Sequence, residues 1–161
     1  MKVPFFTLVL MSFVLSVTLP GQEAYASGKK RFTVIVDAGH GGKDAGATGS
    51  KLKLKEKNVN LSVALELGRL LYEEKGVRII FTRKTDVFIP LDERAAIANK
   101  EKADLFISIH ANAAKSRSAF GTETYVVGSS SKENLQVAMQ ENASILYEDN
   151  YKSRYGGFDP N

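Results

Sequence analysis

The chain contains no cysteine and only two histidines among its 161 residues. Without cysteine it can have neither a disulfide framework nor a lipid attached to an N-terminal cysteine. The mature fold must therefore depend on its apolar core or on a bound metal. The sequence also lacks an internal repeat or a linker, so its length indicates one domain of ordinary size.

Runs of basic residues interleaved with aromatic residues are also missing. Lysine and arginine number 22 against 18 acidic residues, which gives a net charge of +4. This mildly basic balance fits ordinary surface charge as well as a protein that works in an anionic envelope. It gives no sign of a dedicated nucleic-acid-binding face, so no nucleic acid partner is expected.

A long apolar run occurs only at the N-terminus. Lys2 precedes an almost uninterrupted apolar run over residues 3–19, and Ala24 and Ala26 stand three residues and one residue before Ser27. This pattern predicts a secretory signal peptide over residues 1–26, although a retained anchor helix of roughly 20 apolar residues is the alternative. We therefore expect an exported domain over residues 27–161, in the periplasm or at the cell wall outside the cell, without a stable membrane anchor.

Strand and helix patterns alternate along the rest of the chain. Runs of apolar and β-branched residues predict strands at 32–37, 77–82 and 103–109, and helical spacing predicts helices at 58–75 and 90–100. Such alternation is typical of βαβ units, so we expect a single α/β domain with a mostly parallel sheet and helices on both faces. A fourth strand is predicted at 125–127, a third helix at 132–149, and a loop from residue 150.

Both histidines follow the C-terminal ends of predicted strands, His40 after the first and His110 after the third. In a parallel sheet these ends share one edge, where ligand sites form. Glu56 lies in the connection that returns past this edge. Two histidines and one glutamate are typical ligands of a catalytic zinc ion, with the fourth position left for water. No H-E-x-x-H motif is present, so ordinary loop residues remain an open alternative.

Three glycines, Gly39, Gly41 and Gly42, surround His40. Both common phosphate-loop patterns fail at Asp44, where one requires glycine and the other serine or threonine. We interpret the glycines as a sharp turn that brings His40 close to a metal or a substrate, with a plain glycine turn as the alternative.

Several separate blocks between about Arg31 and Gly128 resemble one known family. They are residues 37–47 (DAGHGGKDAGA), residues 55–57 (KEK) with 60–61 (NL), residues 82–83 (TR) with Asp86, Leu91 and Arg94 with residues 98–99 (AN), and residues 103–105 (ADL) with 108–112 (SIHAN). Their order and identity resemble the type 3 class of zinc-dependent N-acetylmuramoyl-L-alanine amidases. The resemblance implies that His40, Glu56 and His110 bind Zn²⁺ and that the substrate is bacterial peptidoglycan. The bond cleaved would be the amide between N-acetylmuramic acid and L-alanine.

Three polar residues, Asp37, Ser108 and Asn112, lie beside the predicted ligands. A ligating imidazole usually donates its second N–H group to an oxygen, so these side chains are candidates for orienting the ligands. Capping of strand ends and turns is the alternative role for each of them.

Two arginines in the family blocks, Arg83 and Arg94, are candidates for substrate binding. A guanidinium group can bind a carboxylate of the stem peptide through paired hydrogen bonds. A structural salt bridge, with Asp86 or Asp92 as the partner, is the alternative use of each arginine.

The resemblance also implies a general base, which in this family is a glutamate near the C-terminal end of the domain. We find no counterpart before Asn161 and therefore expect a C-terminally incomplete amidase domain. Glu123 is the candidate base within this chain, and its alternative role is that of an exposed strand residue. Some amidases of this family are held inactive by a helix over the cleft. We predict that the third helix and the tail after it form such a regulatory insertion, with a protein activator as a possible partner.

Two other functions fit the same residues. An envelope zinc peptidase or carboxypeptidase would use the same ligands on peptide bonds, and its products would be trimmed stem peptides. A non-catalytic peptidoglycan-binding module would keep the cleft and bind cell walls without releasing any product.

Overall fold

The computed structural model describes residues 30–158 except 50–52, 114–117, 119 and 127–131. The predicted signal peptide lies outside the described residues. Three strands, β1 (Phe32–Ala38), β2 (Val77–Phe81) and β3 (Leu105–Ile109), form one sheet in the order β2-β1-β3. Both strand pairs are parallel, as predicted. Within the described part of the chain, no helix is long and apolar enough to cross a membrane.

The central strand, β1, forms the core of the domain. Val34, Ile35, Val36 and Ala38 are all nearly inaccessible to solvent, whereas β2 and β3 are only partly covered. Parallel strands with helices on both faces are buried on both sides, which explains the three consecutive apolar residues at 34–36 in β1.

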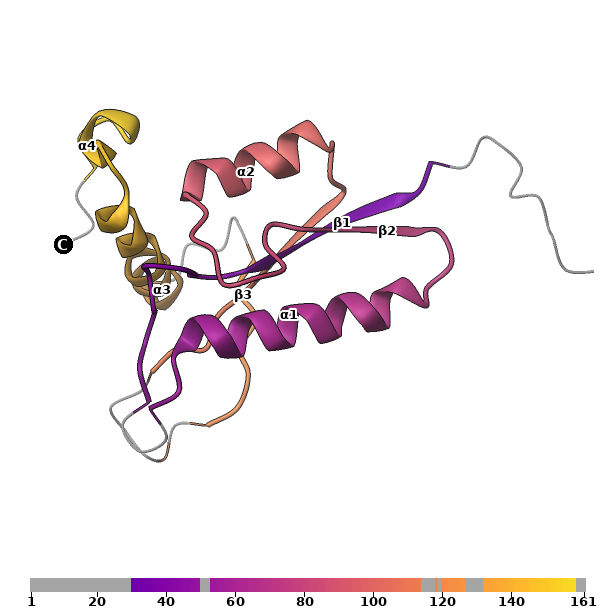
Figure 1. Ribbon diagram of the computed structural model, residues 1–161, viewed down its shortest axis with the longest axis horizontal. Coiled ribbons are helices and arrows are strands. Elements are labelled where there is room, and N and C mark those ends of the chain that lie inside the picture. The colour runs from indigo at the N-terminus through magenta and orange to yellow at the C-terminus, as the bar shows by residue number, and fades with distance from the viewer. Residues whose placement is uncertain (1–29, 50–52, 114–117, 119, 127–131, 159–161) are drawn as a thin grey trace, which may run out of the picture.

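Two helices lie on opposite sides of the sheet, α1 (Glu56–Tyr72) and α2 (Leu91–Lys100) (Figure 1). The side chains of α1 that contact the core strand include Leu61, Ala64, Leu67 and Leu71. Gly68 permits the close approach of α1 to β2, since a Cβ atom there would lie 2.1 Å from the ring of Phe81. The predicted α/β architecture is therefore confirmed, and α1 begins two residues earlier than predicted, at Glu56.

The fourth strand predicted at 125–127 is wrong for Tyr125 and Val126. Both residues are exposed and have no strand assignment, while residue 127 lies outside the described residues. A short apolar run becomes a strand only if a neighbouring strand satisfies its backbone groups.

The C-terminal segment, residues 132–158, consists of α3 (Lys132–Asn142), the 3-10 helix η1 (Ala143–Tyr147) and the single turn α4 (Tyr151–Arg154). The prediction of one helix to residue 149 followed by a loop is therefore only partly correct. Leu135 and Leu146 remain exposed rather than packing on the sheet. α3 lies beyond the end of the sheet where the strands terminate, which agrees with the predicted insertion outside the sheet core (Figure 1).

Candidate metal centre

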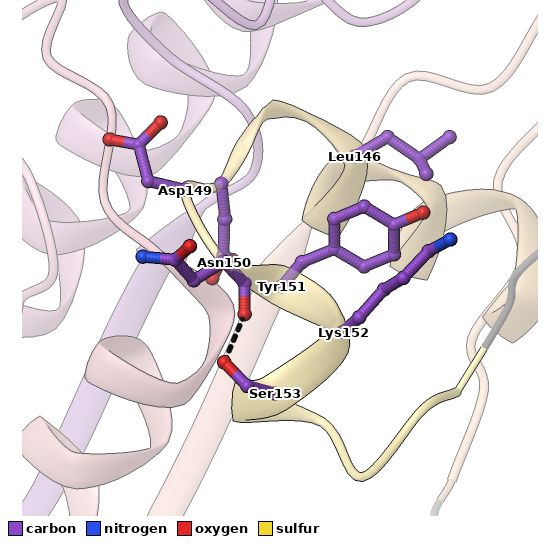
Figure 2. Close-up of a pocket in the computed structure, with 7 residues that line it drawn as sticks. Leu146, Asp149, Asn150, Tyr151, Lys152 and Ser153 are labelled. Carbon is purple, nitrogen blue, oxygen red and sulfur yellow. Dashed lines mark hydrogen bonds between the residues drawn. The ribbon is translucent and has the colours of Figure 1, made fainter.

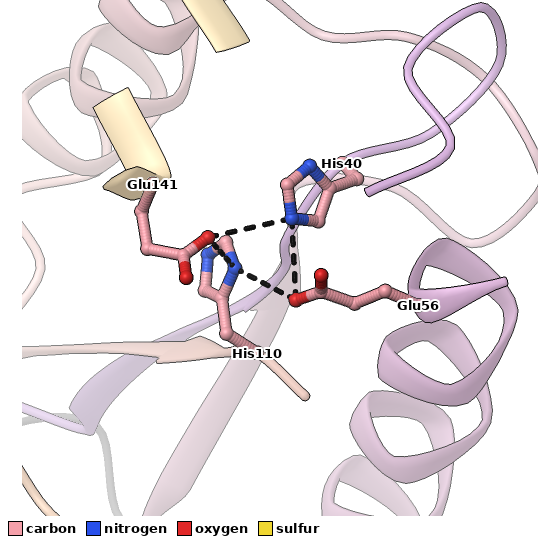
Figure 3. Close-up of side chains that lie close together, drawn as sticks. All are labelled: His40, Glu56, His110 and Glu141. Carbon is pink, nitrogen blue, oxygen red and sulfur yellow. Dashed lines mark hydrogen bonds and ion pairs between the residues drawn. The ribbon is translucent and has the colours of Figure 1, made fainter. Parts of the chain in front are cut away.

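Four side chains converge beyond the C-terminal ends of the strands: His40, Glu56, His110 and Glu141. One nitrogen or oxygen atom of each lies within 4.8 Å of those of the others (Figure 3). The structure thus brings together the three residues predicted as ligands. The fourth, Glu141, comes from α3 and reaches the group from the side opposite α1 (Figure 3).

The parallel register of β1 and β3 places the two histidines side by side. The backbone N–H of Gly39 donates to the carbonyl of Ile109 at 3.0 Å, and the two imidazole centroids are 4.9 Å apart. Glu56, at the start of α1, accepts the N–H of Ala47 at Oε2 and the N–H of Ala111 at Oε1. The carboxylate is therefore held in place by the backbone of two loops.

His40 has a backbone φ of 60°, and its imidazole is oriented by a neighbouring carboxylate. Its Nδ1 lies 2.7 Å from Oδ2 of Asp44, whose other oxygen accepts the N–H of Gly46. With the ring hydrogen on Nδ1, the lone pair on Nε2 points into the group. A carboxylate is a common partner for the second nitrogen of a metal-binding histidine.

The Nε2 atom of His40 is buried and has no hydrogen-bond partner among the described residues. It lies 3.2 Å from Oε1 of Glu56 and 3.4 Å from Oε2 of Glu141. A lone pair that faces two carboxylates is unfavourable unless a cation lies between them. The donor set of two imidazoles and carboxylates therefore fits a divalent metal ion.

Two glycines leave room for these side chains. A Cβ atom on Gly39 would lie 2.3 Å from Cε1 of His110, and one on Gly46 would lie 2.6 Å from Cδ2 of His40. Gly46 also has a φ of 62°, which disfavours other residues. These glycines do more than turn the chain, because they let backbone and imidazole rings approach closely.

The charges in the group favour a bound cation. Burial lowers the pKa of His40, but its contacts with Asp44, Glu141 and Glu56 outweigh this effect and raise the pKa to about 11. Burial likewise lowers the pKa of His110, while Glu141 and Glu56 together raise it to about 9. Burial raises the pKa of Glu56, yet the two histidines and two backbone amides hold it well below its usual range. Without a metal, protons must supply this positive charge.

The contacts of Asp37 and Ser108 correct the prediction that they orient the imidazoles. Asp37 Oδ2 accepts the hydroxyl of Ser108 at 2.7 Å, and Oδ1 accepts Thr82 and Arg94. Asp37 thus joins the three strands to α2. Asn112 lies exposed two residues after His110.

Arg94 forms the structural salt bridge that was its alternative role, with Asp37 as the partner in place of Asp86 or Asp92, whereas Arg83 binds backbone carbonyls. The buried guanidinium of Arg83 donates to the carbonyls of Ala38, Gly39, Lys57 and Thr85. Arg94, also buried, binds Asp37 and donates to the carbonyl of His40 at 2.9 Å. Both therefore hold the backbone around His40 instead of gripping a substrate or pairing with Asp86 or Asp92.

Glu123 lies away from this centre. It is exposed, accepts the hydroxyl of Tyr125, and is not a member of the group of four. The carboxylate that the sequence analysis missed is Glu141, because no motif or spacing distinguishes it from the other polar residues of α3. A cavity of about 520 Å³ in the C-terminal segment, lined by Leu146 and residues 148–153, includes none of the four (Figure 2).

Comparison with known proteins agrees with this arrangement. The family described as N-acetylmuramoyl-L-alanine amidase matches residues 34–156, a stretch that contains all four side chains. The chain belongs to this family. The amidase AmiC of Escherichia coli O6:H1 is 40% identical over 130 residues, which cover 78% of this chain and 31% of AmiC.

Solved amidase structures share the fold. An amidase from Clostridium difficile 630 has a TM-score of 0.56 and 37% identity over 58% of this chain and 50% of that protein. The catalytic domain of CwlV from Bacillus (Paenibacillus) polymyxa has a TM-score of 0.52 and 40% identity over 54% of this chain and 49% of that domain. The chain spans about a third of AmiC and less than a quarter of AmiB of Haemophilus influenzae, which is named a probable N-acetylmuramoyl-L-alanine amidase.

Proposed function

We propose that this chain carries the metal centre of a peptidoglycan amidase. The reaction would be hydrolysis of the amide between the lactyl group of N-acetylmuramic acid and the L-alanine of the stem peptide. The family match over residues 34–156 supports this activity. The observation that carries the proposal is the buried Nε2 of His40, which faces carboxylate oxygens at the edge shared by β1 and β3.

The metal would be Zn²⁺, held by His40, Glu56 and His110. Two imidazoles and one carboxylate suit this ion and leave a fourth position open. A zinc ion bound there would polarise the substrate carbonyl and lower the pKa of the attacking water to about 7. Asp44 would accept the ring hydrogen on Nδ1 of His40. This hydrogen bond would keep the imidazole in the tautomer whose Nε2 is free to bind the ion.

Glu141 would occupy the remaining position and keep the centre closed. Its Oε2 lies 2.6 Å from Nδ1 of His110, and its side chain is mostly buried. Substrate would reach the centre only after α3 moves away, and a protein activator would act by moving it. Glu123 is exposed and lies outside the group of four, so we do not assign it as the general base.

The setting would be the cell envelope. The predicted signal peptide over residues 1–26 would direct export, and residues 27–161 would belong to the mature protein. Peptidoglycan as substrate requires a location in the periplasm or at the cell wall outside the cell.

Zinc content tests the ligand assignment. Replacing His110 with alanine removes one of the two imidazole ligands, so purified His110→Ala protein should lose stoichiometric zinc. The exposed Glu123→Ala variant is the control and should keep one equivalent. Full occupancy in His110→Ala would refute the proposed site.

Product analysis tests the reaction. Purified peptidoglycan is incubated with the zinc-loaded chain and with its Glu141→Gln variant, and released products are identified by mass spectrometry. Intact stem peptides that begin with L-alanine support an amidase. Trimmed stem peptides would instead establish a peptidase, and binding to cell walls without any release would establish a non-catalytic module.

A further inference from the structure

The N-terminus of α2 is capped by residues of the C-terminal segment. Its N-cap residue, Pro90, makes no side-chain cap. Instead, Oε1 of Glu148 accepts the N–H of Leu91 at 2.9 Å, and the hydroxyl of Tyr155 accepts the N–H of Asp92 at 3.1 Å. The first backbone N–H groups of a helix lack partners within the helix, so external acceptors of this kind stabilise it.

The same residues also bind one another. The hydroxyl of Tyr155 donates to Glu148, whose side chain is buried, and NH2 of Arg154 lies 2.6 Å from both carboxylate oxygens of Asp92. Burial, followed by the hydrogen bond to Glu148, raises the pKa of Tyr155 to about 12, so its hydroxyl stays protonated. We name Glu148, Arg154 and Tyr155 the α2 clasp.

A short and partly buried link joins this clasp to the metal centre. Glu141 and Glu148 are connected through η1 (Ala143–Tyr147), in which Ile145 is 1% exposed. Ile145 and Tyr155 line a cavity of about 260 Å³ together with Leu91 and Ala95 of α2. The segment from Glu141 to Glu148 is held by the metal centre at one end, by α2 at the other and by the buried Ile145 between them. It therefore has little freedom to withdraw Glu141 while the clasp is closed.

The contacts of α2 continue from the clasp to the other side of the metal centre. Arg94, one helical turn after Leu91, donates to the carbonyl of His40, the residue with a positive φ. Helix α2 therefore contacts the C-terminal segment through the clasp and the backbone of His40 through Arg94.

We propose that the α2 clasp is the contact that holds Glu141 in the metal centre and that opening it releases α3. This inference rests on the proposed function only in treating Glu141 as the residue that closes the site. The clasp needs no catalysis to act, because its effect is on the position of α3. Activation of the amidase would then require a partner that separates the C-terminal segment from α2.

Hydrogen exchange on the zinc-loaded chain tests the clasp. Tyr155→Phe removes one cap of α2 and the bond to Glu148, and Arg154→Gln removes the ion pair with Asp92. In each variant, amides of residues 135–142 should exchange about ten-fold faster, with a larger effect in the double variant. Arg69→Gln is the matched control, because it breaks an exposed ion pair of similar geometry, with Glu66 on α1.

The outcomes distinguish failure of the clasp proposal from failure of the proposed amidase activity. Faster exchange in residues 135–142 with unchanged exchange in β1 supports the clasp. A failure of every variant to release stem peptides would count only against the proposed amidase activity. Exchange that matches the Arg69→Gln variant would overturn the clasp. Equal acceleration in β1 would also overturn it, because the contact would then stabilise the whole fold.

Discussion

The Nδ1 atom of His40 lies 2.7 Å from a carboxylate oxygen of Asp44, four residues along the same loop. This contact sets the ring orientation and leaves Nε2 facing the metal centre. Replacing Asp44 with asparagine removes the charge while keeping the shape. We expect zinc affinity to fall about ten- to a hundred-fold, measured by competition with a chelating dye. Asp104→Asn, which alters a carboxylate just before β3, should leave the affinity unchanged.

Gly39 makes room for the ring of His110. In Gly39→Ala the new methyl group would lie 2.3 Å from Cε1 of His110, so the ring must move and stoichiometric zinc should be lost. In the control Gly49→Ala the nearest atom would lie 3.6 Å away, an ordinary contact. Metal analysis of both purified proteins provides the measurement. Normal zinc content in Gly39→Ala would show that His110 binds the metal less closely than we propose.

Glu141 has two possible effects on turnover, and substitution separates them. If it only closes the site, Glu141→Gln should release stem peptides faster than the unaltered chain at equal zinc occupancy. If it acts as the general base, the rate should fall about a hundred-fold or more. We expect the rise, measured on purified peptidoglycan. A fall would identify Glu141 as the base and end the proposal that it closes the centre.

Zinc binding should release protons at neutral pH. In the metal-free chain the pKa of His40 is raised to about 11 and that of His110 to about 9, so both imidazoles are protonated at pH 7. Zinc requires neutral imidazoles, so binding should release about two protons, and affinity should rise about a hundred-fold per pH unit between pH 6 and 8. Calorimetry in two buffers with different ionisation enthalpies measures the release. A count near zero would contradict the raised pKa values.

The sequence by itself determined the sheet and indicated three members of the candidate metal centre. β-branched runs that end at His40 and His110 specify two parallel strands, and parallel strands present their C-terminal ends at one edge. Glu56 follows because the connection into α1 must cross that edge. The sheet follows from local periodicity and one rule of topology, whereas the choice of the three residues as metal ligands rests on the resemblance of the motif blocks to the amidase family. The pairing of Asp44 with His40 is equally local, and the spacing of four residues was a signal that the sequence analysis overlooked.

Only the tertiary structure decided the roles of Arg83, Arg94 and Glu141. Both arginines are buried where strand ends and loops leave carbonyl groups without partners, a need that exists only after the elements have packed. Glu141 joins the centre because α3 lies over the sheet edge, with the segment held on α2 by Glu148 and Tyr155. Contacts between residues more than thirty positions apart leave no periodic trace in a single sequence, so their partners become visible only in the folded chain.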